Sequence, residues 1–462
     1  MSNLFLRVTC CCLLLNGLML GGWTANTQGG DPARGYKLLV EKPYLTHDFD
    51  ETTFSNIWKV WPDPERTQAE QATPVERRKM AFGRYGLTSR PGDDLNSETF
   101  KPLQYVVNES GHWTMNCFSC HGGTLMGQVV PGAPNTRYLL QSLSDDMRTL
   151  KVQHYPEKPL SRMERAIFAV PLGTTRGTTN AVMFGVGLMS FRDADLNVRT
   201  PTSIPRMIHH DMDAPPWWVF KKKTHLYAEA YAPRNHRSLM QFALIRSNGP
   251  EKFREWEPDF QDIAAYLESI ESPKYPFPVD HMLASNGKVL FNHHCAECHG
   301  TYGKDGTYPN RVASMQEVGT DPVRFSAIRA QDRAMYGHSW FGDYGKDDII
   351  AERDGYLAPP LDGIWASAPY FHNGAVPTLW HVLNPDARPQ VWRRTDVDGY
   401  DQNHVGFPIE ELQQVPVEVK SPHDRRDYFD TTQFGKSAAG HTFPDALTQE
   451  EKQAVLEYLK TL

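Results

Sequence analysis

Two copies of the pattern C-x-x-C-H constrain this chain more than any other feature of its sequence. They occupy residues 117–121 (CFSCH) and 295–299 (CAECH). C-x-x-C-H is the attachment signature of c-type haem, in which two thiols on one helical turn add to the two porphyrin vinyl groups and the next histidine ligates the iron. The sequence therefore predicts two covalent haem c groups. Their residues are Cys117, Cys120 and His121 for the first (haem 1) and Cys295, Cys298 and His299 for the second (haem 2).

Other uses of these cysteines explain the pattern less well. A thioredoxin-like pair needs only C-x-x-C in a βαβ setting and gives no reason for a histidine after both pairs. A zinc site of four thiolates also leaves both histidines unexplained. Disulfides within C-x-x-C would close very small loops and would stabilise the fold little.

The first 25 residues resemble a secretory signal peptide. Arg7 gives a basic start, residues 8–22 are mostly apolar, and Thr24 and Ala25 form a plausible cleavage point. The run is short for a membrane span, although an uncleaved N-terminal anchor is the alternative. The three remaining cysteines, at positions 10–12, lie inside this segment, and no later stretch is apolar enough to span a membrane. Because haem c is attached outside the cytoplasmic membrane in bacteria, we expect a periplasmic or secreted protein.

The charge of the chain argues against a nucleic-acid partner. The net charge is −7, and removal of Arg7 makes the mature form −7 − 1 = −8. The only compact basic cluster is Lys221–Lys223. Such a triplet is either a solvated face or a surface that steers an acidic electron-transfer partner.

An internal repeat predicts two domains. Residues 258–270 and 447–462 are predicted amphipathic helices, and residues 263–270 and 455–462 within them share the form I/V-x-x-Y-L-x-x-I/L. Thr448 with Glu451 forms a capping box before the second copy. Two unrelated surface helices are the alternative. The proline-rich residues 273–280 form a linker, so the predicted domains are 26–272 and 281–462, with a helix at about 281–291. A closing helix after the haem motif is the usual plan of a class I cytochrome c domain. The 34 glycines and 34 prolines indicate long loops rather than extended sheet, so the chain is predicted to be mainly α: two class I cytochrome c-like domains with long loops.

Residues 357–379 (LAPPLDGIWASAPYFHNGAVPTL) add a family resemblance to this pattern. They resemble the A-P-Y-F-H-[ND]-G-S-V-x-T-L segment of the bacterial di-haem cytochrome c peroxidase superfamily. That superfamily includes the methylamine-utilisation di-haem enzymes and the haem-dependent rubber oxygenases. The resemblance spans roughly residues 80–462 and implies an oxidoreductase with one electron-storing haem and one oxidant-binding haem.

The resemblance also bears on the distal ligand of haem 2. In the peroxidases a ligand methionine lies about a dozen residues beyond the histidine that corresponds to His372, but residues 381–386 contain none. Residues 434–443 (FGKSAAGHTF) are similar to the G-N-S-x-x-G-H-x-F stretch of the rubber-oxygenase-like members. A bis-histidine haem 2 is implied, with His441 as distal ligand, His372 as the alternative and Met335 third.

The surroundings of haem 1 are less constrained. In this superfamily a tryptophan between the haems relays electrons, so Trp218 or Trp217 is the candidate, while tryptophans that close a domain interface are the alternative. Arg176 is a candidate donor to a haem propionate, or part of a surface turn. The candidates for the distal side of haem 1 are His209, His210, Met240 and Phe242.

Three functions follow from these patterns. The first is a cytochrome c peroxidase-type enzyme, in which hydrogen peroxide takes two electrons at haem 1 and a small redox protein of the cytochrome c or cupredoxin type supplies them. The second is a dioxygenase that cleaves an apolar substrate of the polyisoprenoid class with dioxygen at haem 1. The third is a non-catalytic electron carrier. A calcium ion between the domains is known in relatives, but no loop of this chain shows recognisable ligand spacing.

Overall fold

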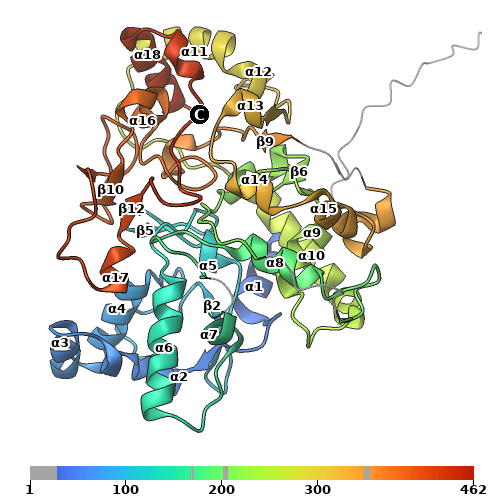
Figure 1. Cartoon of the computed structure of the whole chain (residues 1–462), viewed down its shortest axis with the longest axis vertical. Helices are drawn as coiled ribbons and strands as arrows, with labels where there is room; N and C mark the ends of the chain where they lie inside the picture. The colour runs from blue at the N-terminus through green and yellow to red at the C-terminus, as the bar shows by residue number, and fades with distance from the viewer. Residues whose placement is uncertain (1–28, 167, 169–170, 201–206, 348–353) are drawn as a thin grey trace, which may run out of the picture.

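The computed structural model describes residues 29–166, 168, 171–200, 207–347 and 354–462, so the predicted signal peptide lies outside the described residues. Helices and loops form most of this part of the chain, and its strands have at most four residues (Figure 1). The prediction of a mainly α protein is confirmed. No described helix combines the length and apolar character that a membrane span needs.

The secondary structure has the following bounds. The helices of eight or more residues are α1 (Pro32–Glu41), α4 (Pro74–Tyr85), α6 (Leu140–His154), α8 (Ala181–Met189), α10 (Pro250–Ser269), α11 (His281–His294), α15 (Ala330–Gly337) and α18 (Gln449–Leu459). The shorter α-helices are α2 (Glu51–Ser55), α3 (Glu65–Gln71), α5 (Phe118–His121), α7 (Arg162–Ala166), α9 (His236–Leu239), α12 (Ala296–His299), α13 (Met315–Val318), α14 (Val323–Ala327), α16 (Leu379–Leu383) and α17 (Pro422–Arg425). The 3-10 helices are η1 (Ile57–Val60), η2 (Trp217–Lys222), η3 (Met240–Ala243), η4 (Trp340–Gly345), η5 (Ile364–Ala366), η6 (Pro385–Ala387) and η7 (Phe443–Ala446). The strands are β1 (Phe49–Asp50), β2 (Tyr105–Val107), β3 (His112–Met115), β4 (Thr124–Leu125), β5 (Gln128–Val129), β6 (His225–Leu226), β7 (Ala232–Pro233), β8 (Val312–Ser314), β9 (Gly355–Leu357), β10 (Val391–Arg394), β11 (Ile409–Leu412) and β12 (Tyr428–Asp430).

The strands form small antiparallel sheets. One sheet has the order β1-β3-β2 and pairs Phe49 and Val107 with Trp113. Another has the order β11-β10-β12 and pairs Trp392 with Phe429. The remaining pairs are β4-β5, β6-β7 and β8-β9. These sheets are too small to form a layer of their own, so the helices carry the architecture.

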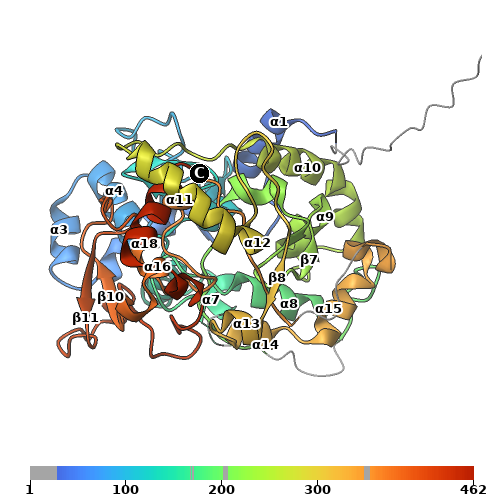
Figure 2. The ribbon, with the colours of Figure 1, turned by 90° about the horizontal axis from the view of Figure 1, so that it is seen from above.

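The same helix pair occurs twice. α1 packs against α10, and α11 packs against α18 (Figures 1 and 2). A glycine lies at each crossing, because an added Cβ on Gly35 would collide with the α10 backbone and one on Gly287 with the α18 backbone. Next to these glycines lie Tyr266 and Tyr458, the tyrosines of the repeated sequence motif. The motif therefore marks two equivalent crossings.

Side-chain caps explain where several of these helices begin. The carboxylate of Asp280 accepts from the backbone N–H groups of the first turn of α11. The predicted capping box of Thr448 and Glu451 at the start of α18 is confirmed. α10 begins at Pro250, two turns before the predicted start, and Pro258 lies inside it.

The apolar core of the first half includes a segment from beyond the predicted linker. Ala327, Tyr336 and Phe341, which belong to α14, α15 and η4, are buried in the same cluster as α1, α10 and Phe118. The hydroxyl of Tyr336 on α15 donates to that of Ser238 on α9 at 3.1 Å, and the ring of Phe341 lies 6.0 Å from that of Phe253 on α10. A second core contains α11, α16, α18 and β10, and a third contains α2, α4 and α6. The domain boundaries stay a prediction, and the packing crosses them.

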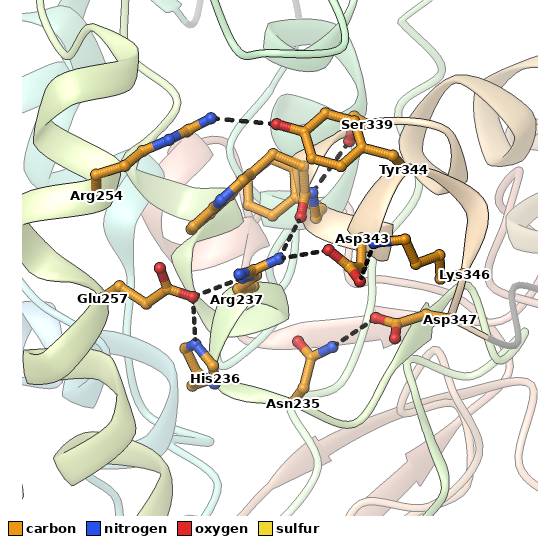
Figure 3. Close-up of polar contacts among 12 residues, drawn as sticks. Asn235, His236, Arg237, Arg254, Glu257, Ser339, Asp343, Tyr344, Lys346 and Asp347 are labelled. Atoms are coloured by element: carbon orange, nitrogen blue, oxygen red, sulfur yellow. Dashed lines mark hydrogen bonds and ion pairs between the residues drawn. The ribbon is translucent and has the colours of Figure 1, made fainter.

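A polar network fastens that segment to the first half (Figure 3). The guanidinium of Arg237 donates to Glu257 on α10 at 2.6 Å and lies over the ring of Trp340, 4.6 Å from its centroid. Asn235 donates to the carboxylate of Asp347 at 3.0 Å. Arg237 also forms an ion pair with Asp343 of η4 at 3.4 Å. Apolar burial and these polar contacts together hold the segment that contains α14, α15 and η4 against the first half.

Candidate functional site

Both C-x-x-C-H motifs form a single helical turn. The N–H of His121 donates to the carbonyl of Cys117 at 3.2 Å, and the N–H of His299 donates to the carbonyl of Cys295 at 3.0 Å. The helices α5 and α12 follow the first cysteine directly. All four cysteines are free thiols. Each turn therefore presents two thiols and one imidazole from consecutive positions of one short helix, as attachment of a haem requires.

A proline carbonyl orients each of these histidines. Nδ1 of His121 lies 3.0 Å from the carbonyl oxygen of Pro215, and Nδ1 of His299 lies 2.9 Å from that of Pro359. A carbonyl only accepts, so Nδ1 carries the proton and Nε2 keeps the lone pair that binds a metal. Burial lowers the pKa of His121 to about 4 and also lowers the pKa of His299. Both imidazoles are therefore neutral and turned for ligation through Nε2.

The two proline acceptors belong to a repeat that the sequence analysis missed. Residues 214–216 and 358–360 both read Ala-Pro-Pro, and in each case the first proline supplies the carbonyl. Proline holds its φ angle near a fixed value, which favours one orientation of the neighbouring backbone. The repeated tripeptide after each haem motif was the available signal.

His441 lies opposite His299. The centroids of the two rings are 6.1 Å apart and the rings are inclined by 64°. When two imidazoles ligate one iron, each metal–nitrogen bond is about 2.0 Å long, and the distance from nitrogen to ring centre adds about 1 Å on each side. The two ring centroids are then roughly 6 Å apart, so one iron fits between His299 and His441. Nδ1 of His441 is buried without a hydrogen-bond partner in the described part of the chain. Burial, followed by the neighbouring imidazole of His299 and the guanidinium of Arg388, lowers the pKa of His441 to about 3, which favours the neutral ligand form.

The alternative ligands of haem 2 lie elsewhere. His372 packs on the ring of Tyr356, with centroids 4.3 Å apart, and makes no ring contact with His299 within the described residues. Burial, then Arg324 and His210, lowers the pKa of His372 to about 3. Met335 is on α15 and packs against the core of the first half. The structure thus brings His441, rather than His372 or Met335, to the ring of His299.

The four distal candidates for haem 1 separate into two pairs. Met240 and Phe242 pack in the apolar core to which Cys117 also belongs. His209 approaches the carboxylate of Asp211 at 3.3 Å, and His210 is buried near Arg324 and His209. In the described part of the chain, the ring contact of His121 is with Trp217, and neither His209 nor His210 stacks on it.

The adjacent tryptophans divide between the two cores. The ring of Trp217 is 4.8 Å from that of His121 and belongs to the first core. Trp218, 1% exposed, belongs to the core of α11 and α18, and its indole N–H donates to the carbonyl of Asp362 at 2.8 Å. One dipeptide therefore connects the surroundings of His121 with the loop that follows Pro359.

Gln241 is a polar residue of this region that sequence reasoning missed. It lies between Met240 and Phe242, is 3% exposed, and accepts from the hydroxyl of Tyr227 at 3.1 Å. Its Nε2 is buried and has no partner among the described residues. No motif marks this residue, because its importance depends on burial that a sequence does not display. The apolar core around Cys117 thus contains an unused N–H donor.

The remaining predictions concern charges. Arg176 donates to the carboxylate of Asp427 at 2.6 Å and to the carbonyl of Arg137 at 3.3 Å, so its described partners are protein groups. For calcium, no three or more His, Cys, Asp or Glu side chains in the described ranges cluster as a metal site.

The site residues fit covalent haem at both motifs. The two thiols lie on one turn, and a proline carbonyl leaves Nε2 of each following histidine free. The half-buried imidazole of His441, whose Nδ1 has no partner among the described residues, faces His299 at the spacing that one iron requires. Nothing in the described contacts gives His121 an equivalent facing histidine. Both motifs can attach a haem in the same way, but His299 faces His441 whereas the described ring contact of His121 is with Trp217.

Comparison with known proteins agrees with this geometry over part of the chain. Residues 355–393 match the family described as RoxA-like, cytochrome c-like, a stretch that includes Pro359 and His372. The chain is 28% identical over 240 residues to the uncharacterized protein y4iM of Sinorhizobium fredii, covering 43% of this chain and 53% of that protein. It is 25% identical over 259 residues to the uncharacterized protein y4iJ of the same organism, covering 42% of this chain and 41% of that protein. The chain thus spans about half the length of these relatives or less.

Proposed function

We propose that this protein is an exported di-haem c-type cytochrome oxidoreductase in which haem 2 stores an electron and haem 1 is where the oxidant reacts. The observation that carries the proposal is the difference between the two haem histidines. His299 faces His441 at 6.1 Å, whereas the described ring contact of His121 is with Trp217. Two strong ligands favour electron transfer, and an iron with one protein ligand has a position for an oxidant.

The residues of this chain would orient the ligand histidines at both haems and would shape the pocket of haem 1. When bound, haem supplies the redox chemistry of its iron, including reaction with peroxide or dioxygen. Pro215 and Pro359 keep the proton of each ligand histidine on Nδ1. The apolar core around Cys117 excludes water. The free N–H of Gln241 is the candidate donor to a bound oxygen species on the distal side of haem 1.

Trp217 and Trp218 are the proposed route for electrons between the two haems. Trp217 touches His121, and Trp218 is bonded to the loop that carries the carbonyl partner of His299. Both indoles are buried and packed in fixed orientations, which suits a relay. A small redox protein would supply the electrons from outside.

Two reactions fit this arrangement. Peroxide reduction to water needs two electrons, which two coupled irons can hold, and this peroxidase-type activity is the leading proposal. The match of residues 355–393 to the RoxA-like family favours a second candidate, oxygenation of an apolar substrate with dioxygen. In both, haem 1 is the reacting centre.

A pair of assays on the haem-loaded protein tests these proposals. We expect peroxide-dependent oxidation of a reduced small cytochrome c, or dioxygen uptake with a polyisoprene oligomer. Gln241→Leu should slow the active reaction about tenfold, because a hydrogen bond to a charged group is worth about 1.5 kcal/mol or more. The control is Gln433→Leu, which changes an exposed glutamine that bonds Asp430 at 3.0 Å. Absence of both reactions in the wild-type protein would favour a simple electron carrier.

A further inference from the structure

One guanidinium holds the loop that carries His441. Arg388 follows η6, close in sequence to the stretch in which the peroxidases have their ligand methionine. Its Nη1 donates to the carbonyls of Ala438 and Gly440 at 2.7 and 2.6 Å, and its Nη2 donates to the carbonyl of His441 at 3.3 Å. The other two N–H groups also find carbonyls: Nε donates to that of His381 at 3.1 Å, and Nη2 donates to that of Val382 at 3.2 Å. An arginine has five N–H donors, so this one is fully used on backbone oxygens.

The surroundings make this use of an arginine unusual. Arg388 forms no ion pair within the described residues, and its guanidinium lies over the ring of Phe371, 4.8 Å from the centroid. Burial lowers its pKa to about 10. A half-buried cation that is bonded to no carboxylate is costly unless its donors are satisfied by other acceptors. Its five carbonyl partners therefore account for its presence at this position.

The loop itself needs to be held. His441 has a φ of +49°, a left-handed conformation that is unfavourable for a residue other than glycine. The N–H of His441 donates to the carbonyl of Val318 at 2.7 Å. Asn373 also donates to the carbonyl of Ser437 at 3.0 Å. These two bonds and the three from Arg388 together fix the backbone of the ligand loop.

We propose that Arg388 is a positioning residue that keeps the His441 imidazole opposite His299. This inference rests on the proposed ligation of haem 2 by His441. Arg388 acts through the carbonyls of residues 438, 440 and 441, and none of its described hydrogen bonds goes to the ligand ring. Without it, His441 would spend more time away from its position, and an external ligand would gain access to haem 2.

The test is titration of the ferric, haem-loaded protein with imidazole, followed by the optical spectrum of haem 2. Imidazole competes with His441, so its apparent affinity rises in proportion to the time that His441 spends away. Lysine keeps the charge but has only three donors and no planar fork. We expect Arg388→Lys to bind imidazole at haem 2 about tenfold more tightly than the wild type, from the loss of one or more charged hydrogen bonds. Arg388→Gln is the second variant if the lysine variant fails to load haem.

Two controls separate this inference from its premise. Arg393→Lys changes an arginine whose partner is the half-exposed Glu410 at 2.6 Å, and it should titrate as the wild type does. In a His441→Ala background, adding Arg388→Lys should change the affinity for imidazole less than about twofold, because Arg388 then has no ligand side chain to position. If Arg388→Lys binds imidazole as Arg393→Lys does while His441→Ala binds it tightly, the positioning role of Arg388 is wrong and the ligation of haem 2 by His441 stands. If His441→Ala leaves the haem 2 spectrum and titration unchanged, the ligation itself is wrong.

Discussion

Replacing His441 by alanine should convert haem 2 of the ferric protein from low spin to high spin. His441 is the imidazole that faces His299 with ring centroids 6.1 Å apart, and its removal would leave the iron with one strong protein ligand. Since each protein carries two haems in this account, half of the total haem should change state. Optical absorption and near-infrared magnetic circular dichroism measure this change directly.

The controls for this variant come from other histidines of the chain. Added imidazole should restore the low-spin spectrum of His441→Ala, because it fills the vacated position. His372→Ala should retain the low-spin haem 2, since His372 packs on Tyr356 instead of facing His299. His404→Ala, at a half-exposed histidine paired with Asp401, should also leave the spectrum as it is. Loss of the low-spin signal in His372→Ala but not in His441→Ala would reverse the ligand assignment.

Glu229→Gln should destabilise the protein by about 3 kcal/mol. Arg324 donates to both carboxylate oxygens of Glu229 at 2.6 and 2.7 Å, and the two side chains are 2% and 0% exposed. Arg324 is on α14, beyond the predicted linker, while Glu229 follows β6 in the first half. Removing the negative charge leaves a buried guanidinium without its counter-charge at the contact between the halves.

Denaturant unfolding of the haem-loaded protein measures this effect. The matched control is Glu410→Gln, whose partner Arg393 is at 2.6 Å but with both side chains more than two fifths exposed. An exposed pair of this kind contributes less than about 1 kcal/mol. Equal free energies of unfolding for the two variants would show that the buried pair does not hold the halves together.

Local features were predictable from the sequence because their causes are local. A C-x-x-C-H turn needs only five consecutive residues, and the capping box of α18 needs Thr448 and Glu451 three positions apart. The start of α10 was misplaced because Pro258 was taken as the first residue of a helix, where proline is common. In the structure, Pro250 has that place and Pro258 lies inside the helix.

Features that depend on distant contacts were beyond the sequence. The carbonyl partner of His121 lies 94 residues away, and that of His299 lies 60 residues away. The five carbonyls to which Arg388 donates lie 6 to 53 residues from it in the sequence. No sequence pattern predicts that a side chain will form hydrogen bonds with backbone carbonyls alone. Burial of Tyr336 and Phe341 in the first core could not be foreseen either, because their apolar character fits a core on either side of the linker.

Electron paramagnetic resonance of the oxidised wild-type protein tests the central claim, the inequality of the two haems, most directly. The bis-histidine arrangement of His299 and His441 predicts one low-spin ferric signal from haem 2. A reserved position opposite His121 predicts one high-spin ferric signal from haem 1 in equal amount. Two low-spin signals with no high-spin component would mean that the protein occupies both distal positions, and would contradict the account.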